Sequence, residues 1–422
     1  MKAAFTKAVV YRVEAVCQTQ LRTGGTGGDT ELVLRNQQGK AIIQGSSLAG
    51  AFRNWLENSD GADSAAHLFG DQEHGGCLMV SEGVFSEDAV QVTRPRLRID
   101  SRLGAAAPKG KFDVAHMAAR SQFTFQLAWL GSEETGAETE TVERMLSALH
   151  RGEIRLGAQK SNGFGRVELT VRKRVYDLFK ADDRLAWLED RCEDGQLISL
   201  PEIRMADQVT FTLLGQADSI LVKGAAAEHG KEGSVIRNIQ ESGKPVIPGS
   251  SIKGAVRARA ALVAGYKGLP EEMVDILFGR MSAQGDNGIS GKIRFEDAVL
   301  APNQARKIAR IRINRFTASV IRGGLFFEEP VCAAVQLRIT IPAEYREGCG
   351  LLVYALRDLA LGLYNLGSGD AIGRGRITVR EIRIKAPGKR EAALTFDADR
   401  QCIVSDPNGL VKDWLDRLEV HK

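Results

Sequence analysis

The sequence predicts an α+β fold built from two tandem ferredoxin-like domains. Two observations lead to this expectation. A Gly-Ser-Ser motif occurs twice, about half a chain apart, and three further motifs repeat in the same order. Each half also shows the order strand, helix, strands, helix, strand, which is typical of a βαββαβ unit with insertions.

The repeated motifs keep nearly constant spacing. The first Gly-Ser-Ser begins at Gly45 and the second at Gly249, an offset of 204 residues. The other offsets are 209 for Leu-Phe-Gly at 68 and 277, 210 for the Gly-rich loops at 163 and 373, and 214 for the Arg-rich strands at 96 and 310. Four ordered motifs at such similar offsets indicate a tandem duplication.

Length and composition fit this organisation. A chain of 422 residues suits two domains of about 200 residues. No apolar run approaches the roughly 18 residues of a membrane span, and the N-terminus leads into a strand rather than a signal peptide. The six cysteines, at 17, 77, 192, 332, 349 and 402, form no CxxC pair. We therefore expect a cytoplasmic protein with no membrane partner, no zinc site and no disulfide framework.

The first half is expected to begin with a strand rich in β-branched residues and to join a short strand to a helix at Gly-Ser-Ser. The expected strands are 6–18, 41–43, 76–84, 88–93, 94–102, 121–130 and 165–174, and the expected helices are 47–57 and 138–150. Residues 104–117 are rich in Ala and Gly, which predicts a mobile loop.

The second half follows the same plan. The expected strands are 207–214, 291–295, 332–341 and 376–384, with a long loop to 244, a hairpin near 323–324, and helices 251–265, 350–364 and 409–419. The last helix is amphipathic and is expected to cap the second domain or to dock on a neighbour. The predicted domains are 1–185 and 207–422, joined by a linker at 186–206.

Positive charge is concentrated at one matching place in each half. Residues 92–111 carry six basic residues and one acid, a net charge of +5, and residues 304–322 carry six basic residues and no acid, a net charge of +6. The whole chain has a net charge of +4, so the remainder is acidic, at −7. Focused basic segments at equivalent positions favour a polyanion partner, nucleic acid above all, over a solvated basic strand face.

Each Gly-Ser-Ser motif is a candidate phosphate-binding helix start. First-turn N–H groups of a helix lack partners and its dipole favours an anion, while serine hydroxyls add donors. We expect the serines to lie at the N-cap, and most such turns are simply caps. Arg53 in the first copy, and Lys253 and Arg257 in the second, would add positive charge, whereas Ala49 stands where Lys253 sits.

The Gly-rich loops 157–166 and 367–376 could wrap a phosphate or a sugar. They lack the Gly-Lys-Ser/Thr of a nucleotide phosphate loop. They also follow a helix and precede a strand, which is the reverse of a dinucleotide-binding turn. These features exclude nucleotide hydrolysis and NAD binding from the main possibilities.

Together, the two strand-turn-helix motifs, the Leu-Phe-Gly after each helix, the Arg-rich strands and the closing Gly-rich loops resemble a known family. The chain looks like two fused copies of the RAMP-superfamily backbone subunit of type III CRISPR effector complexes, and its double length resembles the tandem proteins of subtype III-D. The resemblance spans nearly the whole chain. It implies an RRM-derived, ferredoxin-like core that binds guide RNA along its phosphates beside other subunits of the complex.

The family also implies a projecting hairpin, or thumb, that displaces one nucleotide of the guide–target duplex, and segments 94–112 and 310–327 match it by position. Only 6% of the residues are aromatic, which argues against a base-stacking platform. The residues expected to contact RNA are Gly45, Ser46, Ser47, Arg53, Arg94, Arg96, Arg98, Arg102, Lys160, Asn162, Gly163, Gly165, Gly249, Ser250, Ser251, Lys253, Arg257, Arg310, Arg312, Arg315 and Arg374.

The resemblance further implies a loop acid that cleaves target RNA in antiviral defence. Asp29 lies 16 residues before Gly45, which is the expected place. A carboxylate there could hold a divalent ion such as Mg²⁺ and promote attack by the 2′-hydroxyl on the adjacent phosphate. A turn-forming Asp after Gly-Gly is the simpler alternative. The second half has Gly233 at the matching position, so we expect it to be silent unless the nearby Glu232 or His229 acts.

Two alternatives to a metal-dependent endoribonuclease stay open. The chain could be a structural scaffold that binds guide RNA without cutting, in which case Asp29 only shapes its loop. It could also be a guide-RNA processing nuclease, a class that usually relies on histidine as acid and base, but no histidine here lies suitably beside a Gly-rich loop.

Overall fold

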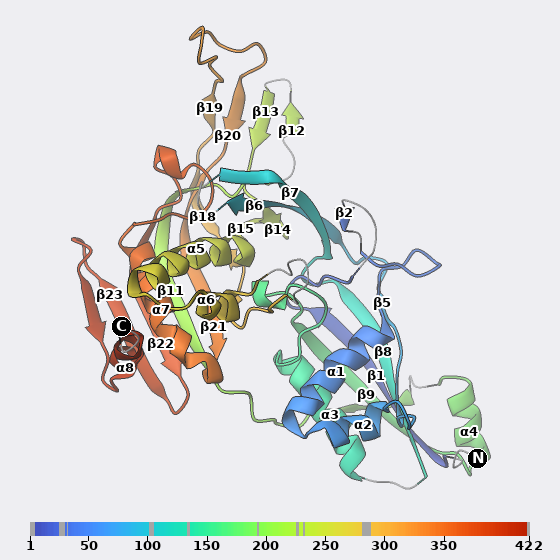
Figure 1. The fold of residues 1–422 in the computed structure, drawn as a ribbon. Coiled ribbons are helices and arrows are strands. Elements are labelled where there is room, and N and C mark those ends of the chain that lie inside the picture. The colour runs from blue at the N-terminus through green and yellow to red at the C-terminus, as the bar shows by residue number, and fades with distance from the viewer. Residues whose placement is uncertain are drawn as a thin grey trace. The chain divides into compact units, whose positions relative to one another are not determined.

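The computed structural model describes residues 5–24, 30–31, 33–100, 105–132, 136–191, 194–224, 228–230, 233–280 and 288–419. They form two compact units (Figure 1). Unit 1 comprises Met1–Thr93, Asp113–Lys160 and Phe164–Met205, and unit 2 comprises Arg94–Phe112, Ser161–Gly163 and Ala206–Lys422. Unit 2 therefore includes two short segments from the first half of the chain.

Unit 1 is built on an antiparallel sheet with the strand order β10-β9-β1-β8-β5-β3, in which β4 also pairs with β8. The central strand β1 pairs along its length with β8 and β9. The strands are β1 (Lys7–Cys17), β3 (Ile42–Ile43), β4 (Leu78–Val80), β5 (Gly83–Phe85), β8 (Gln122–Gly131), β9 (Val167–Asp177) and β10 (Gln196–Ile198).

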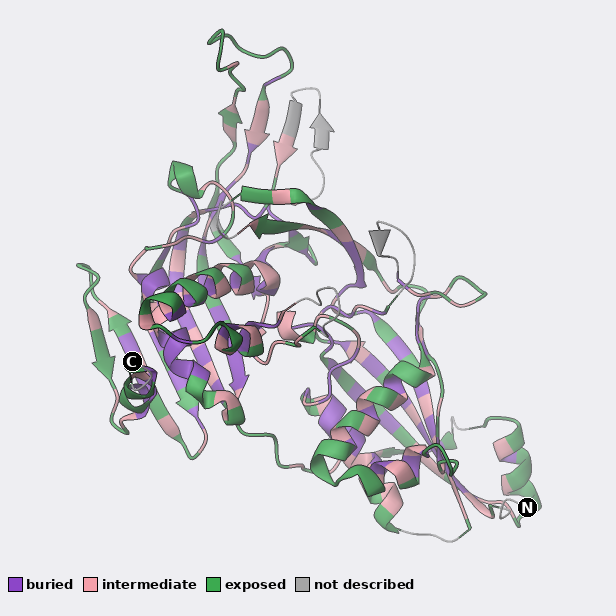
Figure 2. Cartoon of the chain, in the orientation of Figure 1, coloured by how far each residue is buried: buried purple, intermediate pink, exposed green. Residues whose placement is uncertain are grey.

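The central strand β1 points apolar side chains to both faces of the sheet, since successive residues of a strand face opposite sides. Helices pack against these apolar faces. Tyr11 and Val13 pack in the main core with Phe52, while Val10 packs with Ala186 on the other face. The helices are α1 (Gly45–Ser59), α2 (Ala62–Phe69), α3 (Gly136–Arg151), α4 (Ala181–Leu188) and the 3-10 helix η1 (Lys160–Asn162). Figure 2 shows exposed residues on the outer side of α1 and buried residues along the sheet.

Unit 2 repeats this plan with the strand order β16-β21-β11-β22-β23-β24, in which β18 also pairs with β21. Here β11, β21 and β22 correspond to β1, β8 and β9 of unit 1. The strands are β11 (Gln208–Ile220), β16 (Arg294–Phe295), β18 (Ala301–Ala305), β21 (Val331–Pro342), β22 (Ile377–Ala386), β23 (Arg390–Phe396) and β24 (Cys402–Ser405). The helices are α5 (Gly249–Lys267), α6 (Glu271–Phe278), α7 (Cys349–Ala360), α8 (Leu410–Glu419) and the 3-10 helices η3 (Ala343–Gly348) and η4 (Asp370–Ile372).

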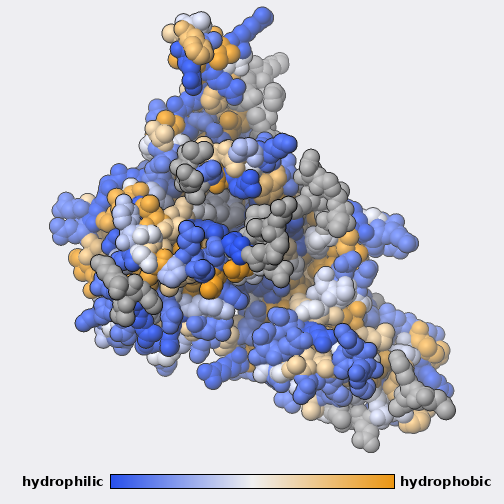
Figure 3. Space-filling view, viewed as in Figure 1, coloured by the Kyte–Doolittle hydropathy of each residue, from blue (hydrophilic) through white to orange (hydrophobic). Residues whose placement is uncertain are grey.

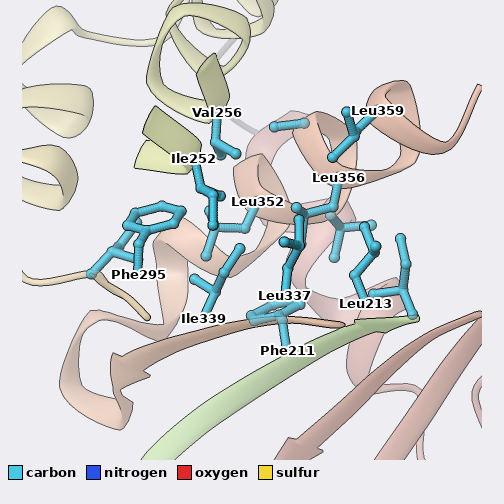
Figure 4. Close-up of a cluster of buried hydrophobic side chains, with 14 of the residues drawn as sticks. Phe211, Leu213, Ile252, Val256, Phe295, Leu337, Ile339, Leu352, Leu356 and Leu359 are labelled. Carbon is cyan, nitrogen blue, oxygen red and sulfur yellow. The ribbon is translucent and has the colours of Figure 1, made fainter. Parts of the chain in front are cut away.

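The core of unit 2 lies between its sheet and helices α5 and α7. Figure 4 shows Phe211 and Leu337 of the sheet facing Ile252 of α5 and Leu356 of α7. Burying one such side chain stabilises the fold by about 1.5–3 kcal/mol. The C-terminal helix α8 adds Trp414, whose ring centroid lies 6.1 Å from that of Phe211. Helix α8 therefore caps unit 2, as the sequence predicts.

Three small sheets extend from these cores. The first has the order β2-β7-β6 and consists of β2 (Thr30–Glu31), β6 (Gln91–Asp100) and β7 (Ala105–Met117). The second has the order β12-β13-β20-β19 and consists of β12 (Glu228–Gly230), β13 (Gly233–Ile236), β19 (Ile308–Arg310) and β20 (Phe326–Glu328). The third has the order β14-β15-β17 and consists of β14 (Gln240–Glu241), β15 (Lys244–Ile247) and β17 (Ala298–Val299). The first two correspond, because in each a strand that precedes the repeated helix pairs in parallel with a hairpin strand.

Two segments differ from the sequence-based expectation. The composition of residues 104–117 predicts a mobile loop, but β7 occupies Ala105–Met117 and buries Val114 and His116. Tertiary pairing here outweighs the weak strand propensity of Ala and Gly. The charged residues 186–206 predict a linker, but they contain the end of α4 and strand β10, which pairs with β9.

The helix starts also differ from expectation. Helices α1 and α5 begin at Gly45 and Gly249, and the N-cap residues are Gln44 and Pro248, without a side-chain capping hydrogen bond. The serines therefore lie inside the first turn instead of at the N-cap. Within the described ranges, none of the helices is long and apolar enough to cross a membrane.

Candidate nucleic-acid interface

The glycine at each repeated helix start is required by the chain's own packing. A Cβ atom added at Gly45 would lie 2.6 Å from the carbonyl oxygen of Val80, and one added at Gly249 would clash with the carbonyl oxygen of Phe295. The close approach made by these glycines is thus to the neighbouring strand of the same unit. Their predicted approach to RNA stays a prediction.

The two repeated helix starts differ in how far their serines are exposed. Neither α1 nor α5 has an acidic residue in its first turn. Ser46 and Ser47 are exposed, and Ser250 and Ser251 are half-buried. Because the helix dipole favours negative charge at this end, the exposed Ser46 and Ser47 of α1 lie where an anion would be stabilised.

At the start of α5, a backbone N–H group already donates a hydrogen bond to a carboxylate of the same unit. The Gly249 N–H donates to Asp297 Oδ1 at 2.7 Å, and Arg94 donates to Asp297 at 2.6 Å and to Glu241 at 2.8 Å. The Arg94 side chain is only 2% exposed. The assignment of Arg94 to an RNA-facing surface is therefore corrected, because this guanidinium is buried between two carboxylates.

Three cations converge beside the same helix. Lys253 Nζ lies 2.9 Å from Ser161 Oγ, which belongs to the first Gly-rich loop. Burial, and to a smaller extent the charges of Arg257 and Arg96, lowers the pKa of Lys253 to about 8. A lysine held near two arginines gains from any anion that enters this site, since the anion would relieve the repulsion. The structure thus brings together Arg96, Lys253 and Arg257.

The repeated helix arginines have matching intrachain partners. Arg53 Nη1 donates to the Gly70 carbonyl at 2.9 Å, and Arg257 Nη1 donates to the Gly279 carbonyl. Both carbonyls belong to the Leu-Phe-Gly turns. Arg257 also pairs with Asp275 at 2.9 Å. Each arginine therefore ties its helix to the following turn, which explains why the two motifs occur together.

The Gly-rich loops also serve the fold. Gly165 and Gly375 have φ of 85° and 73°, and an added Cβ would clash with the carbonyl oxygens of Leu156 and Leu366. The 3-10 turns inside the loops differ between the repeats. Lys160-Ser-Asn fills η1, with Lys160 exposed, whereas Asp-Ala-Ile fills η4. Gly163, with φ of 87°, packs beside the backbone of Glu296.

At the base of the second hairpin, Glu328 forms ion pairs with three basic side chains. Its carboxylate lies 2.6 Å from Arg374, 3.4 Å from Lys223 and 3.3 Å from Arg310. Burial alone would raise the pKa of Glu328, but the pairs with Arg374 and Lys223 lower it. Arg374 is only 5% exposed, so its assignment to the RNA-binding set is corrected as well.

The hairpin between β19 and β20 projects from unit 2 (Figure 1). The Arg312 N–H donates to the Gly324 carbonyl, the Arg312 carbonyl accepts from the Ile321 N–H, and a bridge joins Ile313 to Val320, so the ladder extends beyond the named strands. Arg315 is exposed, and Phe316 at the tip is 89% exposed. Figure 3 shows hydrophilic and hydrophobic residues side by side at this tip. Such a surface can meet both phosphates and bases.

The first hairpin carries a similar mixture on β6. Arg98 is exposed and Arg96 is half-buried, while Leu97 and Ile99 are more than half exposed. Arg102 lies outside the described residues.

Asp29, the predicted cleavage residue, also lies outside the described residues, as does Glu232, and nothing is described of the His229 side chain. The following residue is placed by strand pairing, because Thr30 pairs with Asp113 of β7. In unit 2, Ser234 pairs with Phe326. The two registers match Asp29 with Gly233, as the sequence spacing indicates, and match Asp113 with Phe326.

Asp113 is a candidate functional residue that sequence reasoning missed, because no local motif marks it. It is half-buried on β7, next to the strand that follows Asp29. Magnesium prefers carboxylate oxygens as ligands.

Comparison with known proteins identifies a family for both halves of this chain. A family model described as the RAMP superfamily matches residues 14–168 and 221–378. No curated protein matches. One similar solved chain comes from a cryo-EM structure of the type III-B Cmr-beta complex bound to cognate target RNA, with a TM-score of 0.33 and 18% identity. That match covers 41% of this chain and 62% of the other.

Proposed function

This chain belongs to the RAMP superfamily, and from that premise we propose that it is a guide-RNA-binding backbone subunit of a type III CRISPR effector complex. The family model matches both halves, in agreement with the duplicated sheets. The strand orders β9-β1-β8-β4 and β22-β11-β21-β16 support a ferredoxin-like core in each unit. The double length favours subtype III-D, and the complex would act in the cytoplasm in antiviral defence.

The observation that carries the proposal is the cluster of Arg96, Lys253 and Arg257 at the start of α5. Lys253 Nζ lies 2.9 Å from Ser161 Oγ of the first Gly-rich loop, and burial, followed by the charges of Arg257 and Arg96, lowers the pKa of Lys253. A phosphate beside this lysine would stabilise its charged form. Exposed arginines on the hairpins add further phosphate contacts, which position RNA without reading its sequence. Sequence would then be read by pairing between guide and target.

We propose further that unit 1 cuts the paired target RNA and that unit 2 does not. Asp29 would hold the divalent ion, and Asp113 on the neighbouring strand would help to position that ion. A bound Mg²⁺ would supply charge stabilisation at the phosphate under attack by the 2′-hydroxyl. The matching positions of unit 2 carry Gly233 and Phe326, which offer no metal ligand.

The proposal is tested by assembling the complex with wild-type chain or with Asp29→Ala and adding guide-complementary RNA and Mg²⁺. We expect one specific cut to vanish, by at least about a hundredfold in rate, while the complex still forms. Asp88→Ala, which removes an exposed acid of the same unit, is the matched control and should cut normally.

Two other outcomes would favour the alternatives. An unchanged cut pattern with Asp29→Ala would leave the chain as a scaffold that binds guide RNA. Metal-independent cleavage of a precursor hairpin by the isolated chain would instead point to a guide-processing nuclease.

A further inference from the structure

A mixed set of metal-ligand side chains meets at the helical side of unit 1. His67 lies near the end of α2, Cys77 precedes β4, and Glu138 lies in the first turn of α3. One ligand atom from each, an imidazole nitrogen, the thiol sulfur and a carboxylate oxygen, lies within 4.8 Å of the other two. Three separate elements thus bring their donor atoms close together.

The donors are those that zinc uses. Zn²⁺ binds imidazole nitrogen, thiolate sulfur and carboxylate oxygen at about 2.0–2.3 Å, usually in a tetrahedron. Two ligand atoms of such a tetrahedron lie about 3–4 Å apart. An ion entering this set would therefore separate His67 from Glu138, which are in direct contact without it. Magnesium and calcium prefer all-oxygen sites, so sulfur and nitrogen together favour a softer ion.

The simpler explanation is an ion pair with a thiol nearby. His67 Nε2 does pair directly with Glu138, and Cys77 Sγ lies 3.6 Å from the His67 carbonyl oxygen. An ion pair accounts for two of the three residues. Cys77 also packs against the core of unit 1, but only a metal site would use the ligand atoms of all three residues.

The second repeat has the same turn but lacks two of the donor residues. Gly76 packs against the turn of the first Leu-Phe-Gly, and Gly291 packs against the second in the same way. The residue after Gly291 is Lys292, where unit 1 has Cys77, and Ile276 stands in the place of His67. The turn therefore forms without these donors, so their presence in unit 1 needs another explanation.

We infer that His67, Cys77 and Glu138 form a zinc site with an open fourth position. The His67 side chain is 64% exposed, so water or a fourth ligand can complete the tetrahedron. The ion would join α2, the entry to β4 and α3, and so brace the helical layer of unit 1. This inference does not depend on the proposed RNA function.

Cobalt(II) titration of the metal-free full-length chain tests the site, because Co²⁺ replaces Zn²⁺ and reports its ligands by colour. We expect one Co²⁺ per chain, a thiolate-to-cobalt charge-transfer band, and disappearance of the band when Zn²⁺ is added. Cys77→Ser should abolish the band, and His67→Ala should weaken Co²⁺ binding at least tenfold. Cys332→Ser, which removes a half-buried thiol of unit 2, is the matched control and should keep the band.

Circular dichroism confirms that each variant is folded before titration. A charge-transfer band that survives in Cys77→Ser would overturn the inference, and so would the absence of any saturable band in the wild-type chain. As a second readout, Zn²⁺ should raise the melting temperature of the wild-type chain but not that of the folded Glu138→Gln variant.

Discussion

The two repeated helix starts have the same backbone but different charges. In unit 1, α1 begins beside exposed serines, and Ala49 follows them. In unit 2, α5 begins against Asp297, and Lys253 lies at the position of Ala49. The loops before the helices differ in the opposite sense, since Asp29 is replaced by Gly233. The two copies therefore keep the same strand-turn-helix backbone while the charged residues around it differ.

The largest expected difference concerns the carboxylate at the helix start. Asp297 and Glu82 hold matching positions, two residues after the strand residue that faces the helix-start glycine. Asp297→Ala should destabilise the protein by about 3–5 kcal/mol, because it leaves Arg94 buried with one partner fewer. Glu82→Ala removes an exposed side chain and should cost less than about 0.5 kcal/mol. Urea unfolding measures the free energy of unfolding of both variants. Equal destabilisation by the two substitutions would show that Asp297 has no larger structural role than Glu82.

Lys253 should give the second largest effect, and that effect should depend on pH. Its folded-state pKa of about 8 lies below the ordinary 10.5, so the charged ammonium opposes folding at neutral pH. This cost is complete below about pH 8 and disappears as pH rises toward 10.5. Lys253→Met should therefore be more stable than wild type at pH 7, by at most about 3 kcal/mol.

The difference between Lys253→Met and wild type should close as the pH approaches 10.5. Ala49→Met makes the matched change at the other helix start and should leave the pH profile of unfolding parallel to that of wild type. A constant gain for Lys253→Met across the pH range would show that packing, and not charge, is responsible.

The smallest expected effect concerns the exposed arginines of the second hairpin. Arg312→Ala with Arg315→Ala should weaken guide-RNA binding and reduce the slope of log affinity against log salt by about 0.7 for each phosphate that these arginines neutralise. Lys412→Ala with Arg417→Ala removes equal charge from exposed positions of α8 and is the control. A slope changed equally by both pairs would indicate a general charge effect and not a role specific to the hairpin.

Much of the architecture follows from the sequence, because repeats and apolar periodicity are local signals. The duplicated plan, the central strands and the amphipathic helices can be predicted on that basis. Strand β7 cannot, because its Ala- and Gly-rich residues have weak propensity and are held by pairing with β2 and β6.

The site can be predicted only in part, because burial of a charge depends on distant partners. The sequence pattern suggests that Arg94 and Arg374 are surface cations, yet Glu241, Asp297 and Glu328 pair with them in buried positions. The set of His67, Cys77 and Glu138 escapes prediction for the same reason, since its members come from three elements with no recognisable spacing.

The membership of Arg94–Phe112 in unit 2 bears on the order of synthesis. Arg94 is synthesised well before Glu241 and Asp297, the two acids with which it pairs. The segment that carries Arg94 is therefore available when the rest of unit 2 is synthesised. Translation of residues 206–422 alone would leave Glu241 and Asp297 without this counter-charge. A split of the chain at its midpoint would therefore remove from unit 2 the hairpin segment that supplies its buried arginine.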